Sequence, residues 1–166
     1  LRHLTATGDP TMIARSIAFG ERTSLAFRLH QAIVLLDRFP PSILQLMFRI
    51  AIAAVFWSSG LTKIASWDTT IALFRDEYMV PLLPPEIAAV ISATFELSCS
   101  VLIVLGLATR LATLPLLGMT FVIEVFVYPE YWAMHLMWAS LLLFLLTKGP
   151  GVFSLDHYAQ RFLRGP

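Results

Sequence analysis

Five ionisable residues lie inside long apolar stretches of this sequence, and they mark where chemistry should be sought. They are Arg49, Lys63, Glu96, Glu124 and His135. A charge at the depth of a hydrocarbon core costs at least about 2.5–3.5 kcal/mol on insertion scales. Each of the five is therefore expected to have a partner or to face a polar cavity.

Glu96 lies near the middle of its apolar stretch, and two roles are open for it. It can carry a proton or hydrogen-bond the headgroup of a quinone-like ligand. Alternatively, it forms only a structural pair with a basic residue of the first apolar stretch. Lys63 is the preferred partner because its long side chain can reach down from the outer end, although snorkelling to the interface would also explain a lysine there.

Arg49 and Lys63 cannot belong to one site. They are fourteen residues apart in the sequence, which is roughly four helical turns and about 21 Å. Arg49 stays charged in a protein, so it needs a carboxylate, carbonyl groups or lipid phosphate. We expect it to serve the cytoplasmic half of the protein, with Arg110 near it.

Glu124 and His135 flank the short turn at Pro129 and are expected to face each other. With Lys63 they would line a polar pocket under the connection from Trp67 to Pro85. The lid candidates in that connection are Arg75, Asp76, Glu77 and Tyr78. A Glu/His pair suits several divalent metals, but two ligands are too few, so we assign no metal site. The sequence shows no nucleophile–base pair, so we assign no catalytic residue.

The elements that position these residues are membrane spans. The chain is 57% hydrophobic and 14% charged, with a mean hydropathy of +0.74, whereas soluble domains carry about 25% charged residues. Because a backbone in lipid must satisfy its own hydrogen bonds, the spans are helices. The spans run over Ser42–Ala65, Glu86–Leu107, Leu111–Tyr128 and Tyr131–Thr147. The sequence thus predicts an all-α, four-helix transmembrane bundle in a lipid bilayer.

Two parts are expected, an N-terminal arm (residues 1–41) and the bundle (residues 42–166). The arm shows no cleavable signal peptide. Within it, Ser24–Arg38 has the spacing of an amphipathic helix lying on the membrane surface, or of an extension of the first span. In the bundle, Ser42 is expected to cap the first span and Ser154 a final amphipathic turn, and Thr69–Tyr78 to form a short interfacial helix.

Basic residues near the span ends predict that both termini lie in the cytoplasm, and the expected location is a bacterial inner membrane. The predicted cytoplasmic residues are Arg22, Arg28, Arg38, Arg110, Lys148, Arg161 and Arg164. Only Lys63 and Arg75 fall on the other side. The arm's five arginines suit an acidic protein face or anionic lipid, and the net charge of +1 gives no reason to expect nucleic acid.

Several short patterns occur in a fixed order along the chain. They are Arg49, Phe56, Gly60 and Lys63; Pro81; Glu96; the turn Gly106-Leu107-Ala108-Thr109-Arg110; and Gly149-Pro150-Gly151 with Ser154-Leu155-Asp156. Together they resemble the DoxX family over roughly residues 43–164. The stretch from Phe74 to Pro81 is most similar to a subgroup encoded beside copper-responsive modified-peptide systems.

This resemblance implies a four-helix membrane bundle and an accessory role. Family members are small membrane subunits linked to quinone or thiol redox chemistry and to stress-defence complexes. We therefore expect an accessory subunit of a redox or stress-response assembly, with quinone as the one candidate ligand and other membrane subunits as partners. A small transporter for a peptide, metal or thiol compound and a structural anchor of a larger complex remain alternatives.

Overall fold

A computed structural model of the chain describes residues 26–36 and 38–164. The chain divides into two compact units, Leu1–Pro40 and Pro41–Pro166. In the first unit the described residues form one helix, Ala26–Leu36, and all of its side chains are exposed. The arginines expected to act in the arm at positions 2, 15 and 22 lie outside the described residues.

The second unit contains the four predicted spans. They are α2 (Pro41–Ala65), α4 (Pro85–Leu105), α5 (Thr109–Val122) with its π-helical continuation η2 (Ile123–Val127), and α6 (Trp132–Lys148), which the 3₁₀ turn η3 (Pro129–Tyr131) precedes. All four are long and apolar enough to cross a membrane. The described residues contain no strand, and the predicted all-α bundle is confirmed.

Local chemistry sets where the spans begin and end. Pro41 is the first residue of α2, a position that needs no backbone N–H. The predicted cap Ser42 therefore lies inside the helix, where its Oγ accepts from the backbone N–H of Val152 at 3.5 Å. Gly106 ends α4 with φ of 69°. The N–H of Leu107 donates to the carbonyl of Leu102 at 2.9 Å and so closes the helix C-terminus.

The longest connection is itself mostly helical. It holds α3 (Trp67–Leu73) and the π-helical segment η1 (Phe74–Tyr78). The helical structure predicted for Thr69–Tyr78 is therefore present and begins two residues earlier, and its interfacial position stays a prediction. Met79 and Leu82 then take left-handed backbone angles, with φ of 40° and 72°, which non-glycine residues rarely adopt.

The final helix, α7 (Leu155–Arg164), is tied to the turn between α4 and α5. The Asp156 carboxylate accepts from the backbone N–H groups of Ala108 and Thr109 at 2.8 and 3.1 Å, and so caps α5. As predicted, Ser154 caps α7, because its Oγ accepts from the N–H of His157 at 3.2 Å.

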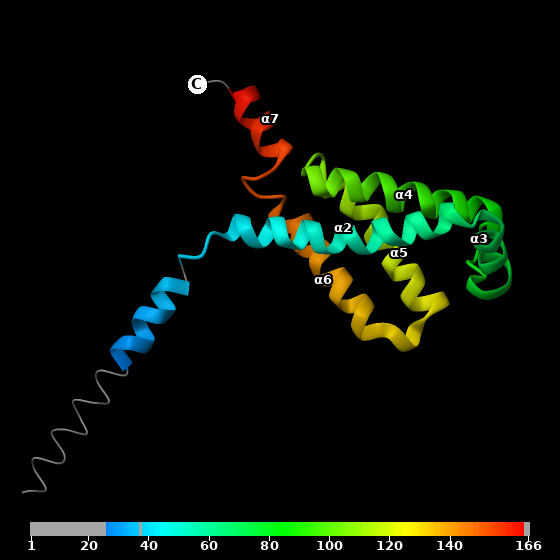
Figure 1. The fold of residues 1–166 in the computed structure, drawn as a ribbon, viewed down its shortest axis with the longest axis horizontal. Coiled ribbons are helices and arrows are strands. Elements are labelled where there is room, and N and C mark those ends of the chain that lie inside the picture. Colours follow the sequence, from blue (N-terminus) through cyan, green and yellow to red (C-terminus); the bar gives the residue numbers. More distant parts are fainter. Residues whose placement is uncertain (1–25, 37, 165–166) are drawn as a thin grey trace, which may run out of the picture. The chain divides into compact units, whose positions relative to one another are not determined.

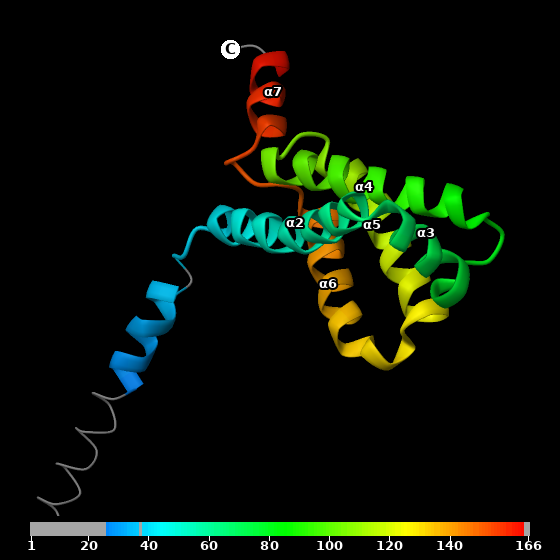
Figure 2. The same ribbon diagram turned by 45° about the vertical axis from the view of Figure 1, so that its right-hand side comes forward.

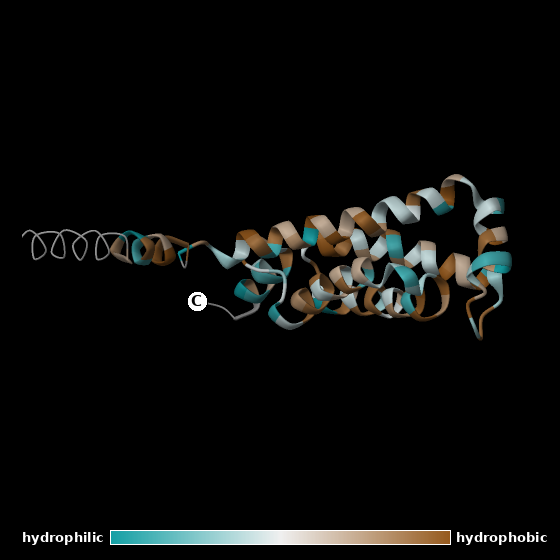
Figure 3. Cartoon of the chain, turned by 90° about the horizontal axis from the view of Figure 1, so that it is seen from below, coloured by the Kyte–Doolittle hydropathy of each residue, from teal (hydrophilic) through white to brown (hydrophobic). Residues whose placement is uncertain are grey.

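Figures 1 and 2 show how the second unit is arranged. Helices α2 and α4 run side by side, and the α5–α6 hairpin crosses them obliquely. We call the end of the unit that carries α3 the α3 end and the opposite end the α7 end. Figure 3 shows mostly hydrophobic residues along the spans, with hydrophilic residues gathered mainly at the two ends.

Two apolar clusters form the core. The larger holds the four spans together and comprises Ile52, Ala53, Phe56, Cys99, Ile103, Ala112, Leu116, Leu142 and Leu145. The smaller comprises Phe74, Ala88 and Ala89 and seats η1 on α4. Cys99 is thus a packing residue. Both clusters contribute to the wall of one cavity.

Candidate functional site

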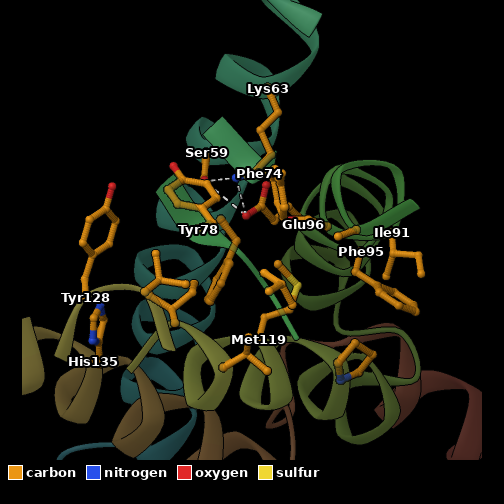
Figure 4. Close-up of a pocket in the computed structure, with 18 of the residues that line it drawn as sticks. Ser59, Lys63, Phe74, Tyr78, Ile91, Phe95, Glu96, Met119, Tyr128 and His135 are labelled. Carbon is orange, nitrogen blue, oxygen red and sulfur yellow. Dashed lines mark hydrogen bonds and ion pairs between the residues drawn. The ribbon is translucent and has the colours of Figure 1, made fainter. Parts of the chain in front are cut away.

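A cavity of about 420 Å³ lies among α2, η1, α4, α5 with η2, and α6. Its wall is mostly aliphatic and aromatic, as the side chains in Figure 4 show. The polar side chains that line it are Ser59, Lys63, Tyr78, Ser92, Glu96, Tyr128 and His135. An apolar cavity with a few polar groups is the usual form of a small-molecule site.

Lys63, Glu96 and Ser59 form a hydrogen-bonded cluster in the cavity wall (Figure 4). The Lys63 Nζ lies 2.8 Å from Glu96 Oε1 and 2.8 Å from Ser59 Oγ, and the Ser59 hydroxyl donates to the same Glu96 oxygen at 3.1 Å. The Glu96 side chain is 2% exposed. The predicted Lys63–Glu96 pair is confirmed.

Gly60 makes this pairing geometrically possible. A Cβ at that position would lie 2.8 Å from the Cγ of Leu97 and 3.2 Å from the Cβ of Glu96, so only glycine allows α2 and α4 to approach so closely. The close approach brings Lys63, one turn beyond Gly60, within reach of Glu96.

A second polar pair joins η2 to α6. The His135 Nδ1 lies 2.6 Å from Glu124 Oε2, so the predicted facing of these residues is confirmed. His135 is buried and lines the cavity beside Trp138, with ring centroids 5.2 Å apart. Glu124 is absent from the cavity wall. The expected polar pocket of Lys63, Glu124 and His135 is therefore a largely apolar cavity that contains two of the three.

The η1 segment covers part of the cavity. Phe74 and Tyr78 line it, and the Tyr128 hydroxyl donates a hydrogen bond to the Glu77 carboxylate. The Tyr78 and Tyr128 rings meet edge to face at 5.8 Å. This acceptor holds the pKa of Tyr128 well above its usual range, while burial raises the pKa of Tyr78.

Of the four lid candidates, only Tyr78 lines the cavity, and Arg75, Asp76 and Glu77 lie outside its wall. Arg75 forms an ion pair with Glu86 at 2.9 Å, in which both side chains are more than half exposed, and Asp76 is exposed. Exposed pairs of this kind contribute little to the stability of a fold, because water and salt screen them. The contact of η1 with the bundle thus depends mainly on Glu77, Tyr78 and Phe74.

Arg49 lies outside the cavity wall and is 1% exposed. Its guanidinium donates to four main-chain carbonyls, those of Ile103, Val104, Pro150 and Phe153, with Nε 2.7 Å from Ile103 and Nη1 2.6 Å from Phe153. Carbonyl groups were one of the partners expected for Arg49. Arg110 is exposed and donates to the carbonyl of Thr147 at 3.3 Å.

Sequence reasoning missed two members of the site. Ser59 lies four residues before Lys63, on the same helix face, and that spacing was the signal for it. Tyr128 was assigned to a span end, and its bond to Glu77 joins residues 51 positions apart, for which the sequence holds no signal.

Comparison with known proteins identifies the family. No curated protein and no solved structure matches the chain significantly. The DoxX family model matches residues 44–129, just over half of the chain and from the first span to the end of the third. With its four apolar helices the chain is a multi-pass membrane protein, and it belongs to the DoxX family.

Proposed function

We propose that this protein is an accessory subunit of a redox or stress-response assembly, and that its cavity binds the headgroup of a quinone. The observation that carries the proposal is the placement of the Lys63–Glu96–Ser59 cluster in the wall of an otherwise apolar cavity. Such a cavity suits a lipophilic ring that bears a few polar atoms.

The lining residues fit a quinone ring. Phe56, Phe95 and Trp138 offer aromatic surface. The Lys63 ammonium offers a third N–H, not directed to Ser59 or Glu96, as a hydrogen-bond donor for a ring oxygen. His135 lines the cavity from α6, and its Nδ1 lies 2.6 Å from Glu124 Oε2. When bound, a quinone supplies redox chemistry that takes up or releases protons as well as electrons.

The proposal includes a bacterial inner membrane with the α7 end in the cytoplasm. Basic residues gather at the α7 end: Arg110 in the first turn of α5, Lys148 at the end of α6 and Arg161 in α7. Because basic residues are enriched on the cytoplasmic side of membrane proteins, this excess favours the proposed orientation. At the α3 end, Lys63 and Arg75 are each paired with a carboxylate. A periplasm-active reporter fused to the C-terminus should be silent, and activity there would reverse the orientation.

Identification of the bound lipophile tests the function. The full chain, purified in mild detergent from bacterial membranes, should retain a quinone detectable by mass spectrometry of the organic extract. Met119→Trp should lower quinone binding by about tenfold or more in calorimetric titration, because Met119 lines the cavity and the larger ring occupies the ligand's volume.

Met137→Trp is the matched control, since Met137 lies on α6 with 56% of its surface exposed and should leave binding unchanged. Equal quinone binding by both variants would place the ligand elsewhere. Absence of quinone with substrate flux in proteoliposomes would favour the transporter. Absence of both, with stable co-purification of a larger complex, would favour the anchor.

A further inference from the structure

The polar cluster in the cavity has one acceptor and one donor unused. Glu96 Oε2 is fully buried and has no hydrogen-bond partner among the described residues. The Lys63 ammonium has three N–H groups, of which two are directed to Ser59 Oγ and Glu96 Oε1. One carboxylate oxygen and one N–H of the same ion pair thus have no partner among the described residues.

An unpartnered carboxylate oxygen in an apolar cavity is costly, because it has lost water and gained no donor. The oxygen belongs to a residue of the cavity wall, Glu96, which lies outside both apolar core clusters. A ligand that supplies a donor at this point would remove that cost.

The chemistry of the ligand follows from the pair of unused groups. A hydroxyl group can donate one hydrogen bond and accept others at the same oxygen. It can therefore donate to Glu96 Oε2 while it accepts from Lys63. A carbonyl or ether oxygen can only accept, and would leave the Glu96 oxygen without a partner.

We propose that the cavity selects a lipophilic ring that carries a hydroxyl group, with Glu96 Oε2 as the atom that recognises the hydroxyl proton. This rests on the proposed function and deepens it: of the two redox forms of a quinone, the dihydroxy form binds more tightly. Glu96 is then the specificity-determining residue, and Lys63 and Ser59 hold its other oxygen in place.

The cavity wall also indicates that such a ring arrives from the bilayer. Ile91 and Phe95 of α4 line the cavity and are still 39% and 38% exposed. They belong to a span, so their exposed surface faces lipid. Pro115 and Met119 of α5 line the cavity as well. A hydroxyl-bearing ring dissolved in lipid can therefore reach Glu96 without passing through water.

A matched pair of ligands tests the proposal: 4-butylphenol, which has a hydroxyl donor, and 4-butylanisole, in which a methyl group replaces that proton. Calorimetric titration of the full chain in detergent should show the phenol binding about tenfold more tightly, the effect of one hydrogen bond to a charged group. Glu96→Gln should reduce this preference to near unity, because the amide can present its donor to both ligands.

Glu86→Gln is the matched control, the same substitution on the same helix at an exposed site, and it should retain the preference. Each ligand partitions into the micelles to the same extent in every sample. Comparing the ratio of the two affinities between wild type and variant therefore cancels the effect of partitioning. The Ser92→Ala variant tests whether the hydroxyl of Ser92, one turn before Glu96, is already the donor to Glu96 Oε2. A marked rise in the preference there would mean that Ser92 already occupies the oxygen, and would overturn the proposal.

The remaining outcomes separate this inference from the proposed function. Binding of both ligands with equal affinity in the wild-type protein, a result that needs no variant to fold, overturns hydroxyl selection and leaves the ring site standing. Binding of neither ligand, nor of a short-chain quinone, overturns both.

Discussion

The cations of Arg49, which is buried, and of Lys63, which is partly buried, are stabilised in different ways. Lys63 is paired with a carboxylate at 2.8 Å, so its charge is neutralised within the site. Arg49 has only neutral carbonyls within hydrogen-bond distance, and it uses four of its five N–H groups on them. Two of these carbonyls, from Ile103 and Val104, belong to the last turn of α4, where carbonyls lack the usual helical donors. That of Ile103 also accepts from the capping N–H of Gly106 at 3.1 Å.

Replacement of Arg49 should therefore destabilise the bundle. Arg49→Leu removes a donor from four main-chain carbonyls, of which that of Ile103 keeps the Gly106 N–H, and we expect a loss of about 2–5 kcal/mol in the free energy of unfolding. Arg49→Lys should be intermediate, because an ammonium group has only three donors and lacks the planar fork. Thermal unfolding in detergent, followed by circular dichroism, measures both.

Arg110→Leu serves as the control for the loss of a cation. Arg110 is exposed and makes one hydrogen bond of 3.3 Å, so its loss should change stability by less than about 1 kcal/mol. Equal melting temperatures for the Arg49 and Arg110 variants would show that the carbonyl contacts do not stabilise the bundle.

At the scale of residues, the sequence predicted which ionisable side chains inside the spans would pair with one another. Lys63–Glu96 and Glu124–His135 followed from the cost of an unpaired charge. The partners of Arg49 were not assigned to residues, because main-chain carbonyls carry no signal in the side-chain sequence. Whether any of these residues binds a ligand or carries a proton stays a prediction.

At the scale of elements, hydropathy located every span to within about three residues of the observed ends. It did not reveal the two π-helical segments, η1 and η2, which lie where α3 and α5 end. A π-helical turn accommodates an extra residue that tertiary contacts hold in place. Here those contacts include the bond from Tyr128 to Glu77, which no local pattern specifies.

That bond should control access to the cavity from water. In a Cys99→Ala background, a cysteine placed at Met119 reports on the cavity, since Met119 lines it. Tyr128→Phe should raise the labelling rate by a charged, water-soluble thiosulfonate about tenfold, because η1 loses a hydrogen bond to a charged group.

Tyr131→Phe provides the comparison for this experiment. The Tyr131 ring also packs on Tyr128, with centroids 5.9 Å apart, and Tyr131 is exposed. Its hydroxyl has no hydrogen-bond partner among the described residues, so the labelling rate should stay at the parent value. An unchanged rate in the Tyr128 variant would show that η1 does not act as a lid.

For the whole molecule, the sequence predicted four helices and could not predict the cavity between them. The cavity's volume depends on how the α5–α6 hairpin crosses α2 and α4 (Figures 1 and 2), and helix crossing depends on the fit of side chains from all four spans. This is why a polar pocket was expected where a largely apolar cavity is found.

The N-terminal arm should be dispensable for the folding of the bundle and necessary for the binding of a partner. Residues Pro41–Pro166 form a compact unit by themselves, so deletion of Leu1–Thr23 should leave the unfolding temperature unchanged and reduce co-purification of membrane partners. Replacement of Arg2, Arg15 and Arg22 by Gln in the full chain should have the same effect, since the arginine forks are the expected contacts. A lower unfolding temperature after the deletion would contradict this.

The carbonyl ring around Arg49 also has a consequence for biosynthesis. Two of its four acceptors, Pro150 and Phe153, follow Arg49 by 101 and 104 residues. The ribosome therefore delivers the α2 span with its guanidinium unsatisfied, and these two carbonyls appear only after the other three spans have been synthesised. During that interval lipid headgroups, water or the insertion machinery must hold the charge, and the nascent chain cannot complete the hydrogen bonds of Arg49 until the segment after α6 emerges.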